Sequence, residues 1–127
     1  MIIFIKHVEI EGPETLGTFF KEKGYEVRTV SLHAGEKLSE DFSGLDAVVS
    51  LGGPMNVYEE EKYPFLKAED DFLKKVLAEN VPFLGICLGA QLLSKAAGGK
   101  VGRSPKEEIG WFDISLTEAG TKDILFH

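Results

Sequence analysis

Apolar positions in the first part of the chain form short runs that predict four β-strands. Residues 2–8 and 82–87 are dominated by near-continuous apolar runs, typical of strands buried on both faces. Residues 25–32 alternate between apolar and polar side chains, which favours a further strand. Residues 46–53 have an apolar centre that leads into two glycines, so this strand is expected to end in a tight turn.

Segments with helical spacing lie between these strands. One helix is predicted to start at Pro13 and to stop at Gly24, because proline suits the first turn of a helix and glycine suits its end. Residues 64–79 form an amphipathic pattern, and residues 88–97 form a helix that two glycines terminate. The alternation of strands and helices predicts an α/β fold with a mainly parallel sheet covered by helices on both faces.

The remainder of the chain predicts further strands. The segments KVGR and EIGWFDISLT (residues 108–117) are expected to be antiparallel, because no long crossover separates them. With 127 residues, 43% of them hydrophobic, the chain is expected to form one domain over residues 1–127.

The composition excludes several classes of function. The net charge of -7 disfavours binding to nucleic acid or to anionic membrane surfaces. The N-terminus has too few apolar residues for a signal peptide, so a cytoplasmic protein is expected. No His or Cys pair falls at a ligand-like interval, and neither a metal nor another cofactor is predicted.

The single cysteine lies in the most informative motif. Gly85-Ile86-Cys87-Leu88-Gly89 has the G-x-C-x-G form of a nucleophile elbow, a sharp turn from a strand into a helix. Glycines on both sides remove side chains that would collide at such a turn. The helix N-terminus would favour the thiolate, and the Leu88 N–H would be close to the oxygen of an attacked carboxamide. A buried, inert cysteine is the alternative interpretation.

A second motif follows the third predicted strand. Gly52-Gly53-Pro54 would emerge at the same carboxyl edge of a parallel sheet as Cys87. Glycines let backbone N–H groups approach a ligand, so the Gly53 N–H is predicted as a second oxyanion donor. Taken alone, this sequence is equally typical of a simple tight turn.

Together, LGGPMNVYEE and FLGICLGAQLL resemble the class I glutamine amidotransferases, in particular stand-alone domains similar to the glutaminase part of GMP synthase. The resemblance covers essentially the whole chain. It implies a flavodoxin-like three-layer sandwich and hydrolysis of the glutamine side-chain amide through a γ-glutamyl thioester. Ala90 replaces a histidine that many relatives carry there, and this change is expected to be tolerated.

The resemblance also implies a role for each site residue. Cys87 is the nucleophile, and the N–H groups of Gly53 and Leu88 bind the oxyanion. The residues implied to bind substrate are Gly52, Pro54 and Gln91, the last lying one helical turn after the cysteine.

The family resemblance further implies a histidine and a glutamate, separated by one residue, well downstream of EIGW. No such pair follows it in this chain, whose histidines are His7, His33 and His127. The His7 position is not catalytic in the family, a solvated loop is expected for His33, and His127 comes too early. We therefore expect a C-terminally truncated domain with little or no turnover, whose exposed edge favours a homo-oligomer.

Several alternatives stay open at this stage. The superfamily of DJ-1 and the PfpI proteases also carries a cysteine elbow, but with histidine where this chain has Leu88. A γ-glutamyl peptidase would use the same thioester chemistry, whereas a non-catalytic glutamine-binding or regulatory domain would not. An amidotransferase would pass ammonia to a synthase domain or subunit that this sequence does not identify.

Overall fold

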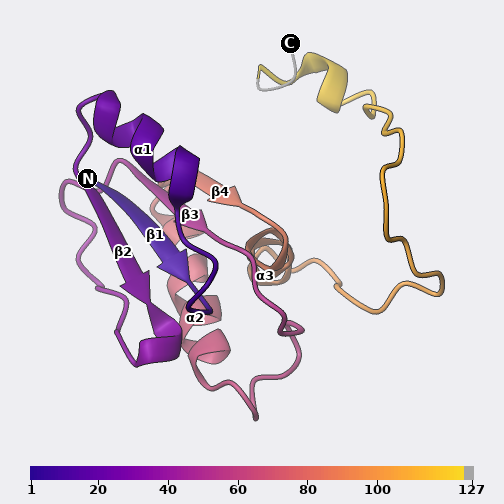
Figure 1. Ribbon diagram of the computed structural model, residues 1–127, viewed down its shortest axis with the longest axis horizontal. Coiled ribbons are helices and arrows are strands. Elements are labelled where there is room, and N and C mark those ends of the chain that lie inside the picture. The colour runs from indigo at the N-terminus through magenta and orange to yellow at the C-terminus, as the bar shows by residue number, and fades with distance from the viewer. Residues whose placement is uncertain (125–127) are drawn as a thin grey trace.

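The structure, a computed structural model, describes residues 1–124 and has a four-stranded sheet at its centre (Figure 1). The strands are β1 (Ile2–Lys6), β2 (Val27–Ser31), β3 (Ala47–Ser50) and β4 (Phe83–Gly85). Their order in the sheet is β2-β1-β3-β4, and every pair is parallel. Each predicted strand before residue 88 is present, although each is shorter than its apolar pattern.

Three helices cover this sheet: α1 (Glu14–Glu22), α2 (Phe65–Ala78) and α3 (Leu88–Ala96). Two single-turn 3₁₀ helices, η1 (Leu32–Ala34) and η2 (Gly120–Lys122), complete the elements. Helix α1 lies on one face of the sheet, whereas α2 and α3 lie on the other (Figure 1). The layers are therefore helix, sheet and helix, and the α/β prediction is confirmed.

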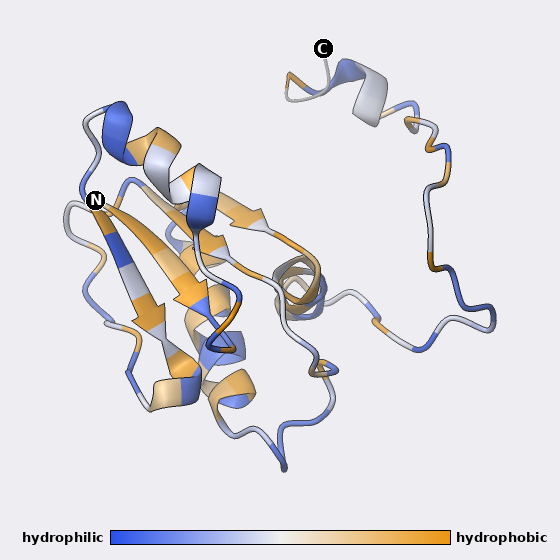
Figure 2. Cartoon of the chain, in the orientation of Figure 1, coloured by the Kyte–Doolittle hydropathy of each residue, from blue (hydrophilic) through white to orange (hydrophobic). Residues whose placement is uncertain are grey.

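Strand β1 contributes to two separate hydrophobic cores because its side chains alternate between the faces of the sheet. Ile3 and Ile5 pack in the larger core with α2 and α3, whereas Ile2 and Phe4 pack in the smaller core under α1. All four side chains are at most 2% exposed. Burial on both faces explains the uninterrupted apolar run, which Figure 2 shows along the central strands.

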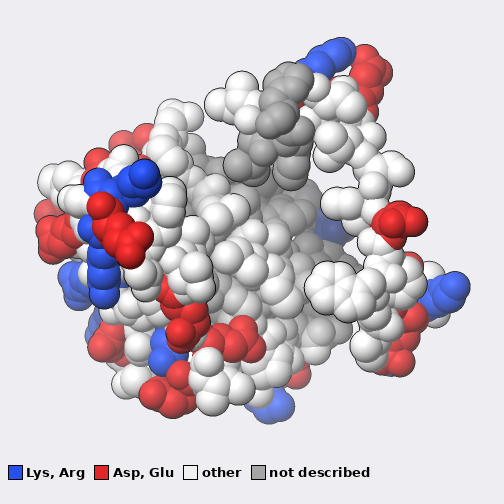
Figure 3. All heavy atoms as spheres, turned by 45° about the horizontal axis from the view of Figure 1, so that its top comes forward, with Lys and Arg blue, Asp and Glu red and all other residues white. Residues whose placement is uncertain are grey.

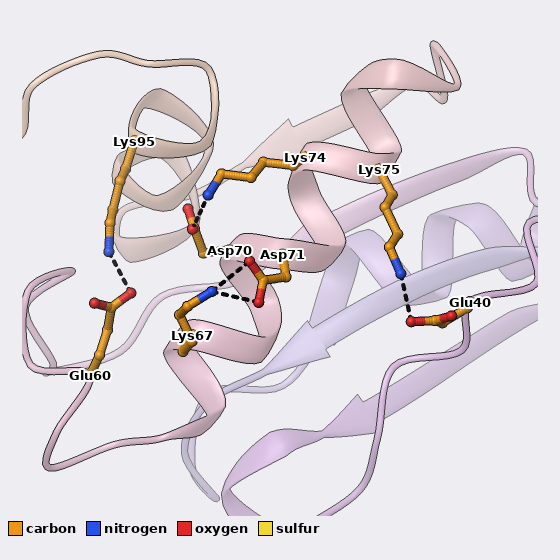
Figure 4. Close-up of polar contacts among 8 residues, drawn as sticks. All are labelled: Glu40, Glu60, Lys67, Asp70, Asp71, Lys74, Lys75 and Lys95. Atoms are coloured by element: carbon orange, nitrogen blue, oxygen red, sulfur yellow. Dashed lines mark hydrogen bonds and ion pairs between the residues drawn. The ribbon is translucent and has the colours of Figure 1, made fainter.

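Ion pairs lie along the outer surface of α2 and α3, and two of them, Lys95–Glu60 and Lys75–Glu40, join a helix to a neighbouring loop (Figure 4). The Lys95 ammonium lies 2.7 Å from the Glu60 carboxylate and also donates to the Val57 carbonyl at 3.0 Å. These contacts attach the long loop after β3 to helix α3. The other pairs drawn are Lys67–Asp71 and Lys74–Asp70.

The strands predicted after residue 99 are absent from the described part of the chain. Residues 98–119 contain neither helix nor strand and run away from the body of the protein (Figure 1). Their apolar side chains are solvated, and Trp111 is 103% exposed. A strand requires a partner and a surface on which to bury one face, and local alternation of residue types supplies neither. The prediction of antiparallel strands was therefore wrong for this structure.

The molecular surface has no single dominant sign on the face shown in Figure 3. Acidic and basic groups are interspersed there around a broad uncharged area. None of the helices in residues 1–124 has the length and apolar character needed to cross a membrane.

Candidate active site

Cys87 lies at the junction between β4 and α3, where the backbone turns sharply. Its φ of 54° and ψ of -110° place a non-glycine residue in a sparsely populated region of backbone conformation. The thiol is exposed, so the alternative of a buried, inert cysteine is wrong. Strain of this kind persists only where the surrounding structure imposes it, and here it presents the sulfur to solvent at the carboxyl edge of the sheet.

The two flanking glycines are required because backbone atoms pass close to both. A Cβ at Gly85 would lie 2.6 Å from the backbone N and Cα of Ala90, in the first turn of α3. A Cβ at Gly89 would lie 2.6 Å from the carbonyl carbon of Ser50, at the end of β3. Real Cβ atoms essentially never come this close to other heavy atoms, so the elbow can form only with glycine at both positions.

The Gly52-Gly53-Pro54 loop packs directly against this elbow. A Cβ at Gly52 would be 3.6 Å from the Cβ of Cys87, and a Cβ at Gly53 would be 3.0 Å from Leu88 Cδ2. Gly52 is buried, whereas Pro54 is exposed. The structure thus brings together the two motifs that lie 35 residues apart in the sequence, counted from Gly52 to Cys87.

Two backbone N–H groups near the thiol have no internal acceptor. Within residues 1–124, neither the Gly53 N–H nor the Leu88 N–H donates a hydrogen bond to another group. Leu88 is the first residue of α3, where N–H groups point out of the helix and carry its partial positive charge. Both groups are therefore available to an oxygen atom bound beside Cys87.

Gln91 lies on the exposed side of α3, one turn after the cysteine, and its N–H donates to the Cys87 carbonyl at 3.2 Å. Together with Asn56, Tyr58 and Ser94 it lines a cavity of about 620 Å³. A second depression, of about 460 Å³, is lined by Gly52 and Ile86 among others. Each depression is thus lined by neighbours of Cys87, although Cys87 itself lines neither.

A buried polar network lies beneath the Gly52–Gly53 loop, and no sequence pattern predicted it. His7 Nδ1 is 2.9 Å from the Gly52 carbonyl oxygen, and His7 Nε2 is 2.7 Å from Glu69 Oε2. The Ser50 hydroxyl donates to Glu69 Oε1 at 2.7 Å. All three side chains are 0% exposed. The sequence contains two indications of it: the apolar run of β1 ends in the polar residue His7, and Glu69 lies on the apolar face of α2.

The environment of His7 favours its protonated form. Burial lowers the pKa of the imidazole. The hydrogen bond and the charge of Glu69 raise this pKa, as do the hydrogen bond to the Gly52 carbonyl and the charge of Glu11, and together they outweigh the effect of burial. The net result is a His7 pKa above its ordinary value. The hydrogen bond to Glu69 therefore stabilises the protonated imidazole more than burial destabilises it.

The two described histidines, His7 and His33, pair with carboxylates and not with the thiol. His7 and Glu9 are separated by one residue, but His7 pairs with Glu69 whereas Glu9 pairs with His33 at 2.9 Å. His33 belongs to η1 and its side chain is only 21% exposed, so the expectation of a solvated loop residue was wrong. His127 lies outside the described residues. No hydrogen bond within residues 1–124 joins the Cys87 thiol to a histidine.

We found no group of three His, Cys, Asp or Glu side chains within residues 1–124 that could hold a metal ion.

The elbow generates a prediction about stability. Gly89→Ala should destabilise the fold by about 3 kcal/mol or more, because backbone atoms of Ser50 cannot move away from the new methyl group. Gly102→Ala is the matched control, since a Cβ there meets nothing within 4 Å. Its effect should stay within about 0.5 kcal/mol. Urea unfolding monitored by circular dichroism would measure both, and equal stability of the two variants would contradict the steric explanation.

The buried network generates a prediction about pH. Since the folded-state pKa of His7 is raised above 6.5, its stabilising contribution is fully present below about pH 6.5 and is lost as the pH rises through the folded-state pKa. The free energy of unfolding should therefore fall as the pH rises above about 6.5. His7→Asn should remove this component of the slope. The carboxylates with lowered pKa values, such as Glu9, titrate below this window. If the free energy of unfolding changes with pH equally in the unaltered chain and in His7→Asn, the pH dependence does not come from His7.

Comparisons with known proteins agree with this fold. The family described as glutamine amidotransferase class-I matches residues 14–125. A glutamine amidotransferase-like protein of Salmonella typhimurium is 33% identical over 122 residues, which cover 94% of this chain and 51% of the relative. One subunit of the glutamine-hydrolysing GMP synthase of Sulfolobus acidocaldarius is 38% identical over 87 residues, covering 68% of this chain and 43% of the relative.

Solved structures show the same fold. A glutamine amidotransferase from Thermotoga maritima superimposes with a TM-score of 0.72 at 44% identity, covering 76% of this chain and 42% of that one. A glutamine amidotransferase from Methylobacillus flagellatus gives a TM-score of 0.79 at 30% identity, covering 87% of this chain and 43% of that one. The chain spans about half the length of these relatives. It belongs to the class I glutamine amidotransferase family.

Proposed function

We propose that Cys87 is the nucleophile that attacks the side-chain amide of glutamine. The observation that carries this proposal is the exposed thiol on a strained elbow, with the Gly52–Gly53 loop packed against it. The position at the start of α3 supports it, because a helix N-terminus stabilises the thiolate.

The backbone donors would stabilise the first intermediate. Attack by the Cys87 sulfur on the carboxamide carbon forms a C–S bond and moves an electron pair to the amide oxygen. The free N–H groups of Gly53 and Leu88 would donate to that oxyanion. We assign Gly52, Pro54 and Gln91 to the pocket that holds glutamine, because Gly52 lies against Cys87, Pro54 follows the two loop glycines and Gln91 lies one turn after Cys87 on α3.

The remaining steps require proton transfer. Collapse of the intermediate breaks the C–N bond, and the nitrogen leaves as ammonia after it takes up the thiol proton. Water then hydrolyses the γ-glutamyl thioester to glutamate and restores the thiol. Both steps need a base, and no residue of this chain is assigned to that role. We therefore propose that these 127 residues, as an N-terminal portion with no His-x-Glu pair after EIGW, turn over glutamine slowly or not at all.

The fate of the ammonia would depend on a partner. Several relatives, among them those of Sulfolobus acidocaldarius and Thermosipho melanesiensis, are named as glutamine-hydrolysing GMP synthases or a subunit of one. We propose a division of labour here, with glutamine as substrate and with ammonia passed to a synthase domain or subunit. A γ-glutamyl peptidase would share the thioester step, whereas a glutamine-binding regulatory domain would leave Cys87 unreactive.

Covalent labelling tests the proposal directly. The electrophile 6-diazo-5-oxo-L-norleucine, which resembles glutamine, should modify Cys87, as measured by mass spectrometry of the intact chain and its peptides. Excess glutamine should protect the thiol, and Cys87→Ala should give no adduct. Iodoacetamide serves as the control for general thiol reactivity and should not be blocked by glutamine.

Two results would contradict parts of this proposal. If excess glutamine does not slow the labelling of Cys87, the proposed glutamine site is contradicted. Steady release of glutamate by the purified chain, abolished by Cys87→Ala, would show that the chain supplies its own base and would refute the expected lack of turnover.

The exposed sheet edge generates a further prediction, that the chain forms a homo-oligomer. Leu84 in β4 and Ile86 beside it are each 41% exposed, and Ile109, Trp111 and Ile114 in the C-terminal segment are more than 80% exposed. Apolar surface of this kind at a strand edge favours association. Size-exclusion chromatography with light scattering should give a mass above 14.0 kDa that rises with concentration. A monomer at every concentration tested would count against it.

A further inference from the structure

The network of His7, Glu69 and Ser50 joins three elements beneath the candidate site. His7 directly follows β1, Glu69 lies in α2 and Ser50 ends β3. Each side chain is fully buried, and a buried polar group without a partner destabilises a protein by about 1–3 kcal/mol. Apolar side chains would fill this space without burying polar groups. We therefore expect the network to have a role beyond packing.

The hydrogen-bond partners determine where one proton must be. The Gly52 carbonyl oxygen can only accept, so His7 Nδ1 must carry a hydrogen and donate it. This holds whether Nε2 donates to the Glu69 carboxylate or accepts from the protonated acid. Ser50 holds the other oxygen of Glu69 and thereby fixes its orientation. The network therefore directs the His7 Nδ1–H group at the Gly52 carbonyl oxygen.

The peptide between Gly52 and Gly53 transmits this constraint. The chain has no cis peptide bond among its described residues, and in a planar trans peptide the C=O and the following N–H point in opposite directions. Fixing the Gly52 carbonyl toward His7 therefore directs the Gly53 N–H away from His7. Two successive glycines leave this peptide otherwise free to rotate, because neither has a Cβ to restrict it.

The same two glycines also contact the elbow. A Cβ at Gly52 would be 3.6 Å from Cys87 Cβ, and a Cβ at Gly53 would be 3.2 Å from His7 Cβ and 3.0 Å from Leu88 Cδ2. The Gly53 N–H has no acceptor within residues 1–124. The Gly52–Gly53 peptide is thus in contact with both the network and the elbow.

We propose that His7 is a positioning residue that holds the Gly52–Gly53 peptide in the orientation in which the Gly53 N–H serves the oxyanion, with Glu69 and Ser50 orienting His7. This inference rests on the proposed function, because it assumes that Cys87 forms a tetrahedral intermediate. Loss of one such donor in other enzymes lowers the rate about 10²- to 10³-fold. Loss of its positioning should have a smaller effect of the same kind.

A pair of matched variants separates this role from simple packing. In His7→Asn the side-chain amide can replace Nδ1–H and still donate to Gly52, but it cannot reach Glu69. In His7→Gln the amide can replace Nε2 and contact Glu69, but it cannot donate to Gly52. Both variants lose one buried hydrogen bond, so a packing role predicts similar effects for the two.

Two thiol reactions provide the readout. Acylation by the γ-p-nitrophenyl ester of L-glutamate passes through an oxyanion, whereas alkylation by iodoacetamide does not. Acylation is measured as the burst of p-nitrophenolate above a Cys87→Ala blank. Relative to alkylation, it should fall about 10- to 100-fold in His7→Gln and by less than about threefold in His7→Asn. Equal ratios in the two variants would overturn the inference.

A measurement on the unaltered chain covers the case in which a variant does not fold. Long-range ¹H–¹⁵N correlation spectra of the histidine-labelled protein should show a proton on His7 Nδ1 from about pH 6 to pH 9, since the carbonyl partner requires it. An unprotonated Nδ1 would overturn the inference whatever the variants do. Absence of any acylation burst in the unaltered chain would instead refute the proposed thioester chemistry, and the inference with it.

Discussion

The close approach of two backbones is the constraint on which the site depends. The first turn of α3 lies against the end of β3 with no side chain between them, so that the Gly89 N–H donates to the Leu51 carbonyl at 3.1 Å. The Ile86 N–H also donates to the Ser50 carbonyl at 2.9 Å. These contacts hold the elbow beside the loop that follows β3. The position of Cys87, its strained backbone and the exposure of its thiol all follow from them.

Ser50 connects the elbow to the buried polar network. Ser50 contributes its carbonyl to the elbow and its hydroxyl to Glu69, so one residue connects the strand end to the buried network. The same edge of the sheet therefore has an exposed side that carries the thiol and an enclosed side that carries the hydrogen-bonded His7–Glu69 pair. Hydrogen bonds are stronger in the enclosed part, because its local dielectric constant is lower than that of water.

Local patterns were sufficient to predict much of this fold. The strands before residue 88 were identified because apolar runs reflect burial on two faces, and the elbow was identified because its glycines stand at fixed spacing from Cys87. His7 and Glu69 could not be paired in advance, since 62 residues separate them and each type is common on protein surfaces. The segment 108–117 was misassigned because pairing of a strand depends on a neighbour that the local sequence does not specify.

The steric requirement at Gly85 and Gly89 also changes how relatives of this chain should be interpreted. Both positions exclude any side chain because of neighbouring backbone atoms, not because of the reaction. A homologue that had exchanged its cysteine and become a binding protein would still need both glycines to keep its shape. Retention of this glycine pair is therefore a marker of ancestry and architecture, and it carries no information about whether a given family member is still a catalyst.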